Sequence, residues 1–184
     1  DQRYMKSGSV SDAERSVSMY EKSCLAGRKE ACFGAVRGIL LGPSESNPEL
    51  SPPARVDRAA ERRRVLLAKG CELDDPQFCK EASDAFLGED AQRSEQLGRK
   101  YCVLELTDKG KRDACVMQRE QRARQAQQGA NRCASGQPGG CLALGNSVVT
   151  VDRVRAREAY ARECKGRRLD VQGNADACVK VYES

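Results

Sequence analysis

Residues 71–79 read CELDDPQFC, and they open a stretch in which cysteines return at a constant interval. The first cysteines of four successive segments, each 31 residues from the next, are Cys71, Cys102, Cys133 and Cys164. Self-similarity at a period of about 20 to 50 residues is typical of stacked arrays, in which each unit buries its apolar face against its neighbours. The interval therefore predicts a repeat protein.

The ten cysteines fall into five local pairs, since each repeating cysteine is followed by a second one and an earlier pair precedes them. An even number of paired cysteines is typical of disulfides in an oxidising compartment. Buried free thiols and zinc sites are the alternatives, and zinc is disfavoured because its cysteines usually stand about two to four residues apart, often with His, which the chain lacks. The expected disulfides are Cys24–Cys32, Cys71–Cys79, Cys102–Cys115, Cys133–Cys141 and Cys164–Cys178.

The composition favours helices throughout the 184 residues, because strong helix formers dominate and aromatic residues make up only 4%. Capping residues, glycines and prolines suggest where helices begin and end. Helices are expected at residues 12–26, 29–41, 54–72, 75–87, 90–106, from 111 onward, within 121–134, at 140–146, from 152 to 164, and in a short segment reaching Tyr182.

Spacing in the first repeat also predicts which side chains face inward. The inner face of its first helix is expected to carry Ala13, Val17, Tyr20 and Cys24. The inner face of its second helix is expected to carry Cys32, Val36 and Leu40. In the last repeat the expected inward residues are Ala156, Ala159, Tyr160 and Cys164.

These elements suggest one repeat domain spanning residues 1–184. Its repeats are expected at about 12–42, 54–88, 90–120, 121–147 and 152–184. Residues 43–53 are rich in proline and form an expected loop between the first two repeats. Such a loop is either a solvated insertion or a segment that touches a ligand, since long loops on rigid scaffolds often carry function.

Two stretches resemble a known repeat family. Residues 20–27 followed by Glu30-Ala31-Cys32, and residues 156–164 with Ala177-Cys178, are similar to Sel-one-like repeats, which are relatives of the tetratricopeptide repeat. The cysteine-paired form resembles secreted helical cysteine-rich proteins of bacteria. The resemblance extends over residues 12–182, although the family's usual unit is somewhat longer. It implies an adaptor that binds proteins or peptides, and some cysteine-rich members are associated with β-lactam binding or hydrolysis.

We therefore expect an all-α fold, a right-handed α-solenoid of about five disulfide-stapled helical hairpins. In such an array the first helices of successive repeats line the concave surface. Arg and aromatic side chains on that surface are the types that most often anchor interfaces. The expected partner-binding residues are Arg62, Arg99, Tyr101, Arg124 and Arg157.

The charge distribution is uneven around a net charge of +5, with 22 Arg among 32 basic residues. Residues 153–168 hold seven basic residues against two Glu, and residues 62–64 and 119–132 carry further Arg clusters. These are either solvated helix faces or a surface for an acidic partner, an anionic glycan or lipid headgroups. Nucleic acid is not expected, because few aromatics could stack on bases.

No catalytic motif, phosphate-binding loop or metal-ligand cluster is present, so we expect neither an enzyme nor a cofactor or metal. The leading hypothesis is a non-catalytic protein- or peptide-binding scaffold, periplasmic, outer-membrane-associated or secreted, whose partner could be acidic. The alternative is a receptor-like or structural module for an anionic surface polymer or lipid headgroups, and a less favoured one is a β-lactam-binding or hydrolysing enzyme. The longest apolar runs are too short to span a bilayer. Because the chain opens on Asp1, we expect a mature or trimmed form.

Overall fold

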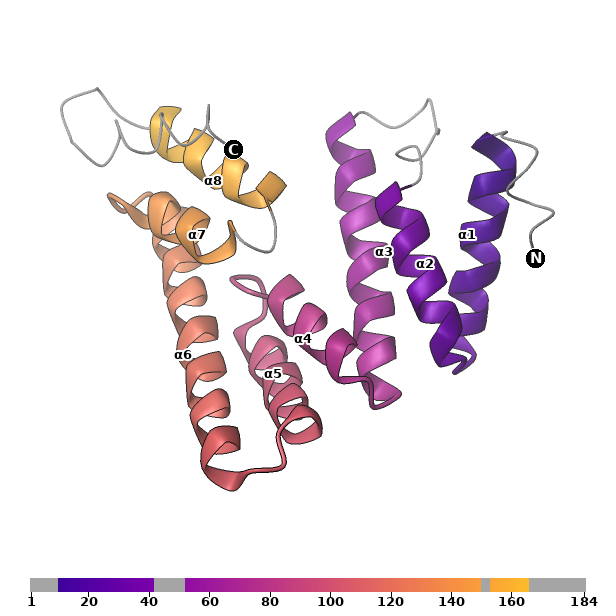
Figure 1. The fold of residues 1–184 in the computed structure, drawn as a ribbon. Coiled ribbons are helices and arrows are strands. Elements are labelled where there is room, and N and C mark those ends of the chain that lie inside the picture. The colour runs from indigo at the N-terminus through magenta and orange to yellow at the C-terminus, as the bar shows by residue number, and fades with distance from the viewer. Residues whose placement is uncertain (1–9, 42–51, 150–152, 166–184) are drawn as a thin grey trace. The chain divides into compact units, whose positions relative to one another are not determined.

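The computed structural model describes residues 10–41, 52–149 and 153–165, and every regular element in these ranges is a helix (Figure 1). This confirms the all-α class. The helices are α1 (Val10–Leu25), α2 (Lys29–Leu41), α3 (Pro52–Glu72), α4 (Pro76–Ala85), α5 (Ala91–Glu105), α6 (Lys109–Ala134), α7 (Gly140–Val148) and α8 (Arg153–Lys165). Helix α3 begins at Pro52, two residues before the expected start at Ala54, because the fixed φ of proline suits the first helical turn. The rest of the expected loop 43–53 lies outside the described residues. The expected final helix lies outside the described residues.

Contacts along the chain group into two compact units, Asp1–Cys79 and Lys80–Ser184, called unit 1 and unit 2 below. The boundary falls inside α4. Each unit is considered by itself. A single repeat domain, and the hand of a solenoid, stay predictions.

Unit 1 begins with an α1–α2 hairpin whose helices approach closely at glycines of α2. The Tyr20 ring of α1 lies where a side chain on Gly34 would be, and Val17 occupies the same position against Gly38. This confirms that these two residues face α2, as predicted. Leu40 was expected on the inner face with Val36, but that is wrong, since Leu40 is 61% exposed whereas Val36 is buried.

The second hairpin of unit 1 joins α3 to α4 across a capped turn. Asp75 accepts a hydrogen bond from the N–H of Phe78 (3.2 Å) and so caps the start of α4. Its other carboxylate oxygen pairs with Lys29 of α2 at 2.9 Å. Burial would raise the pKa of Asp75, but the hydrogen bonds and charge of Lys29 and the N–H of Phe78 outweigh burial and lower it. Asp75 thus holds the turn and ties α4 to α2.

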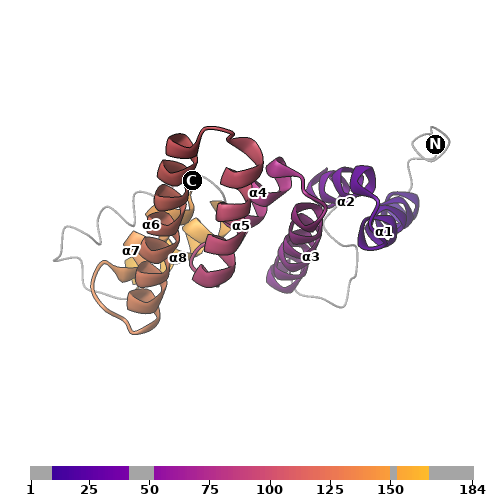
Figure 2. The same cartoon turned by 90° about the horizontal axis from the view of Figure 1, so that it is seen from below.

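In unit 2 one long helix replaces two expected ones. The sequence predicts separate helices on either side of residue 120, but α6 runs without a break over 26 residues (Figure 2). Cys115 and Cys133 lie 18 residues apart on α6, about five full turns, so both point to the same side of the helix. Cys115 bonds to α5 and Cys133 bonds to α7. Two successive hairpins therefore share α6, and no helix end marks the expected boundary between residues 120 and 121.

The core of unit 2 is built from small residues on α6 and larger ones around them. Its buried members are Leu87, Ala123, Ala126, Leu144, Val148, Ala156, Ala159 and Tyr160. Of the residues expected to face inward on α8, Ala156, Ala159 and Tyr160 are indeed buried. At the start of α7, the carboxylate of Glu163 accepts hydrogen bonds from the N–H groups of Gly139 (2.8 Å) and Cys141 (3.0 Å). A side chain of α8 thereby caps α7, whose own N-cap residue is a glycine.

Four of the five predicted disulfides are confirmed, each joining consecutive helices. They are Cys24–Cys32, Cys71–Cys79, Cys102–Cys115 and Cys133–Cys141. The fifth, Cys164–Cys178, includes Cys178, which lies outside the described residues. By the chain-entropy model each closed loop of this length stabilises the fold by about 2.5–3 kcal/mol.

Candidate functional site

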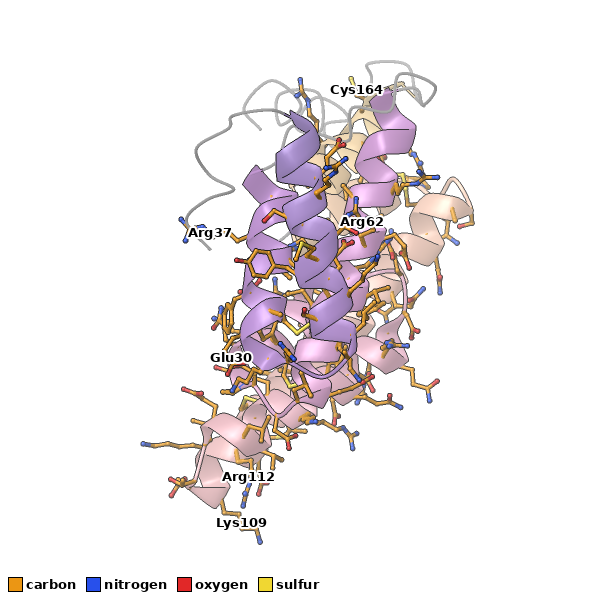
Figure 3. All side chains as sticks on the ribbon, turned by 90° about the vertical axis from the view of Figure 1, so that its right-hand side faces the viewer. Glu30, Arg37, Arg62, Lys109, Arg112 and Cys164 are labelled. Atoms are coloured by element: carbon orange, nitrogen blue, oxygen red, sulfur yellow. A yellow bond between two sulfur atoms is a disulfide. The ribbon has the colours of Figure 1, made fainter. Side chains whose placement is uncertain are left out.

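The five predicted partner-binding residues are distributed over both units. Arg62 of α3 belongs to unit 1 and is labelled in Figure 3. Its guanidinium pairs with Glu21 of α1 at 2.9 Å. Arg157 of α8 is exposed and has no ion-pair partner in the part of the chain that the structure describes. The remaining three lie on the α5–α6 hairpin of unit 2, and two of them meet there.

Arg99 and Arg124 converge on one carboxylate, that of Glu120. Arg99 of α5 reaches Glu120 Oε1 at 2.6 Å, and Arg124 of α6 reaches Glu120 Oε2 at 2.9 Å. Arg124 also lies 3.5 Å from Glu95 of α5. These four residues, Glu95, Arg99, Glu120 and Arg124, are called the Arg99–Arg124 surface below.

Local sequence explains why these side chains meet. Glu95 and Arg99 are four residues apart on α5, and Glu120 and Arg124 are four apart on α6, so each pair shares one face of its helix. The caps of both helices and the Cys102–Cys115 disulfide hold the hairpin in register, because Asp90 accepts from Arg93 N–H and Asp108 from Lys111 N–H. The two faces therefore stand side by side.

In this surface the two arginine side chains are exposed, whereas the carboxylate between them is largely covered. The side chains of Arg99 and Arg124 are 58% and 63% exposed, whereas that of Glu120 is only 15% exposed. A guanidinium carries five N–H donors in a planar fork, and these contacts use one nitrogen of Arg99 and two of Arg124. The surface therefore presents oriented N–H donors above a carboxylate that fixes them.

Tyr101 is held by a different arginine. The Cζ atom of Arg119 lies 5.1 Å from the centroid of the Tyr101 ring, and Arg119 pairs with Asp84 of α4 at 2.7 Å. Arg122 reaches the same Asp84 oxygen at 3.2 Å. Tyr101 thus belongs to a second charged group, in which residues of α5 and α6 meet Asp84 of α4. Sequence reasoning missed the partners Asp84, Glu95 and Glu120, although the four-residue spacings within α5 and α6 point to the last two.

Unit 2 also contains a cavity of about 280 Å³ between α6, α7 and α8. Its apolar wall includes Ala130, Leu144 and Ala159, and its polar wall includes Glu158 and Arg162. Its volume is at the low end for small-molecule sites, and none of the five predicted partner-binding residues lines it. Across residues 10–41, 52–149 and 153–165 no group of three or more acidic, Cys or His side chains could hold a metal ion.

No protein-family model, curated protein or solved structure matches this chain. Among the described helices, none is long and apolar enough to cross a membrane. The assignment of function therefore depends on the side chains described above.

Proposed function

We propose that this chain is a non-catalytic, Sel-one-like scaffold that binds a protein or peptide in the bacterial cell envelope or outside the cell. The Arg99–Arg124 surface is part of the binding site. The partner presents carboxylate or carbonyl oxygens to the two guanidiniums. Four disulfides support an oxidising compartment, where such bonds persist.

One observation carries this proposal: two exposed arginines of neighbouring helices are held by the same half-buried carboxylate. Arginine is enriched among the residues that dominate binding energies. A side chain that is already ordered loses less conformational entropy when a partner arrives, so Glu120 favours binding by holding both guanidiniums in place. The remaining N–H groups can then donate hydrogen bonds to a partner without rearrangement.

The pairing also favours a protein partner over an anionic polymer. A polymer with many negative charges gains most from basic groups that have no carboxylate beside them. Arg99 and Arg124 are both paired, and so is Arg62 in unit 1. Local neutralisation weakens the long-range attraction that a polymer would need, while short, directional hydrogen bonds to a protein remain available.

A phage-displayed library of random linear peptides, selected on the oxidised protein, tests the proposal. We expect enrichment of peptides that carry Asp or Glu beside apolar residues. Affinity of a synthetic copy is then measured by calorimetry for the native chain and for the double variant R99E/R124E. The variant is expected to bind at least about tenfold more weakly, because two attractive contacts become repulsive.

The matched control is K109E/K111E, which makes the same change in charge at two exposed positions of the same hairpin. It is expected to bind within about twofold of the native chain, since surface changes away from an interface have little effect. Circular dichroism confirms that both variants remain helical. Enrichment of no peptide, or equal affinity of R99E/R124E and the control, contradicts the proposal. Binding of heparin that falls steeply with salt, without peptide binding, supports the polymer alternative.

A further inference from the structure

Unit 1 presents an exposed stripe along α2 that neither the cysteine pattern nor the proposed site explains. Its members are spaced by three, four and three residues, so they share one face of the helix. They are Glu30, Phe33, Arg37 and Leu40, and all four are exposed. We call them the α2 stripe, and Figure 3 labels Glu30 and Arg37 on the same side of unit 1.

The aromatic centre of the stripe is rigidly supported. Phe33 is 50% exposed, and its ring packs at a tilt against that of Phe78 of α4, with ring centroids 4.4 Å apart. Phe78 is itself buried. Beside the stripe, Tyr20 of α1 is 42% exposed and is packed over Gly34. These rings are ordered before any partner arrives, which is typical of interface anchors.

The two charged residues of the stripe are available to pair with another molecule. Glu30 and Arg37 have no ion-pair partner among the residues that the structure describes, whereas Lys29 beside Glu30 is paired with Asp75. Glu30 and Arg37 stand seven residues apart, about 10.5 Å along the axis, on either side of Phe33.

We propose that the α2 stripe is a self-association surface, occupied by the α2 helix of a second copy of this chain in antiparallel orientation. In a two-fold symmetric contact, residue i meets residue j and j meets i. With the axis midway between Glu30 and Arg37, each Glu30 faces Arg37 of the other copy, and the two Phe33 rings meet near the axis. The stripe is thus complementary to itself in charge, which an unrelated partner would not require.

Charge exchange between the two positions tests this proposal on the full oxidised chain, by sedimentation equilibrium over a range of concentrations. The native chain is expected to form dimers. In R37E two carboxylates face each other at both ends of the contact, and in E30R two guanidiniums do, so each single variant is expected to dimerise at least about tenfold more weakly. The double variant E30R/R37E restores both attractive pairs and is expected to recover dimerisation to within about threefold of the native chain.

The matched control is K22E, which makes the same charge change as R37E. Lys22 is exposed and lies two residues after Tyr20, about 200° around α1 from the side chain that packs on α2. K22E is expected to dimerise like the native chain. If the chain stays monomeric up to a protein concentration of about 1 mM, the proposal is overturned, since a dimer with a dissociation constant above that value is not a specific contact. Single variants that dimerise normally, or a double variant that fails to recover while circular dichroism shows an intact helical fold, overturn it equally.

Discussion

Replacing Glu163 by Ala is expected to destabilise the start of α7 by about 3 kcal/mol. The Glu163 side chain is buried, and each of its oxygens accepts a backbone hydrogen bond, at 2.8 Å from Gly139 and 3.0 Å from Cys141. A hydrogen bond to a charged group contributes about 1.5–3 kcal/mol, so two contribute about 3–6 kcal/mol. In the variant, water that reaches the two N–H groups recovers part of this free energy. The expected loss is therefore at the lower end of the range.

Native-state hydrogen exchange measures this loss at the Cys141 amide, because opening of α7 controls its exchange. A change of about 3 kcal/mol corresponds to about 100-fold less protection. E163Q keeps one acceptor oxygen and is expected to lose about half as much free energy, or about tenfold in protection. E158A, at an exposed position on the same helix, is the control and is expected to stay within about 0.5 kcal/mol. If the Cys141 amide is equally protected from exchange in E163A and in E158A, Glu163 does not stabilise α7.

Gly145→Ala is expected to cost about 1–3 kcal/mol in thermal melts followed by circular dichroism, because the added methyl group would overlap the Tyr160 ring; unchanged melting would contradict this packing. The pKa of Asp75 is lowered from its ordinary 3.8 in the folded chain, so its stabilising effect is present above about pH 4 and is lost as the pH falls through the folded pKa. Removing the cation with Lys29→Met is expected to make acid unfolding less steep in this window, and an unchanged acid profile would show that the pair does not contribute. Replacing both cysteines of the Cys102–Cys115 bridge by Ser is expected to lower stability by about 3 kcal/mol in guanidinium unfolding, and a loss well below that would show that the loop is already ordered in the unfolded chain.

Local features were the ones that could be predicted from the amino-acid sequence. The bounds of α2 match the expected residues 29–41, and the disulfide pairs within residues 24–141 are as predicted. Both depend on short-range geometry. Capping residues and glycines end a helix within a few residues, and two cysteines eight residues apart across a helix turn lie close whatever the rest of the chain does. The all-α class follows from the same local preferences.

The sharing of α6 by two hairpins was decided by tertiary structure. The repeat suggested that every cysteine pair has two helices of its own, yet residues 111–128 contain neither Gly nor Pro to end a helix. A spacing of 18 residues lets one helix offer Cys115 and Cys133 on the same side to two different neighbours. Packing against α5 and α7 therefore makes one long helix sufficient, which the cysteine interval alone cannot reveal.

The partners of charged side chains were also decided by tertiary structure. The sequence by itself determined that Arg99 and Arg124 lie on helices. It did not determine that both would share Glu120, or that Glu163 would cap α7 from another helix. The contacts of Glu120 with Arg99 and of Glu163 with α7 join residues more than about 20 positions apart, so they depend on the angle and register at which helices pack. These are set by how small and large side chains interlock.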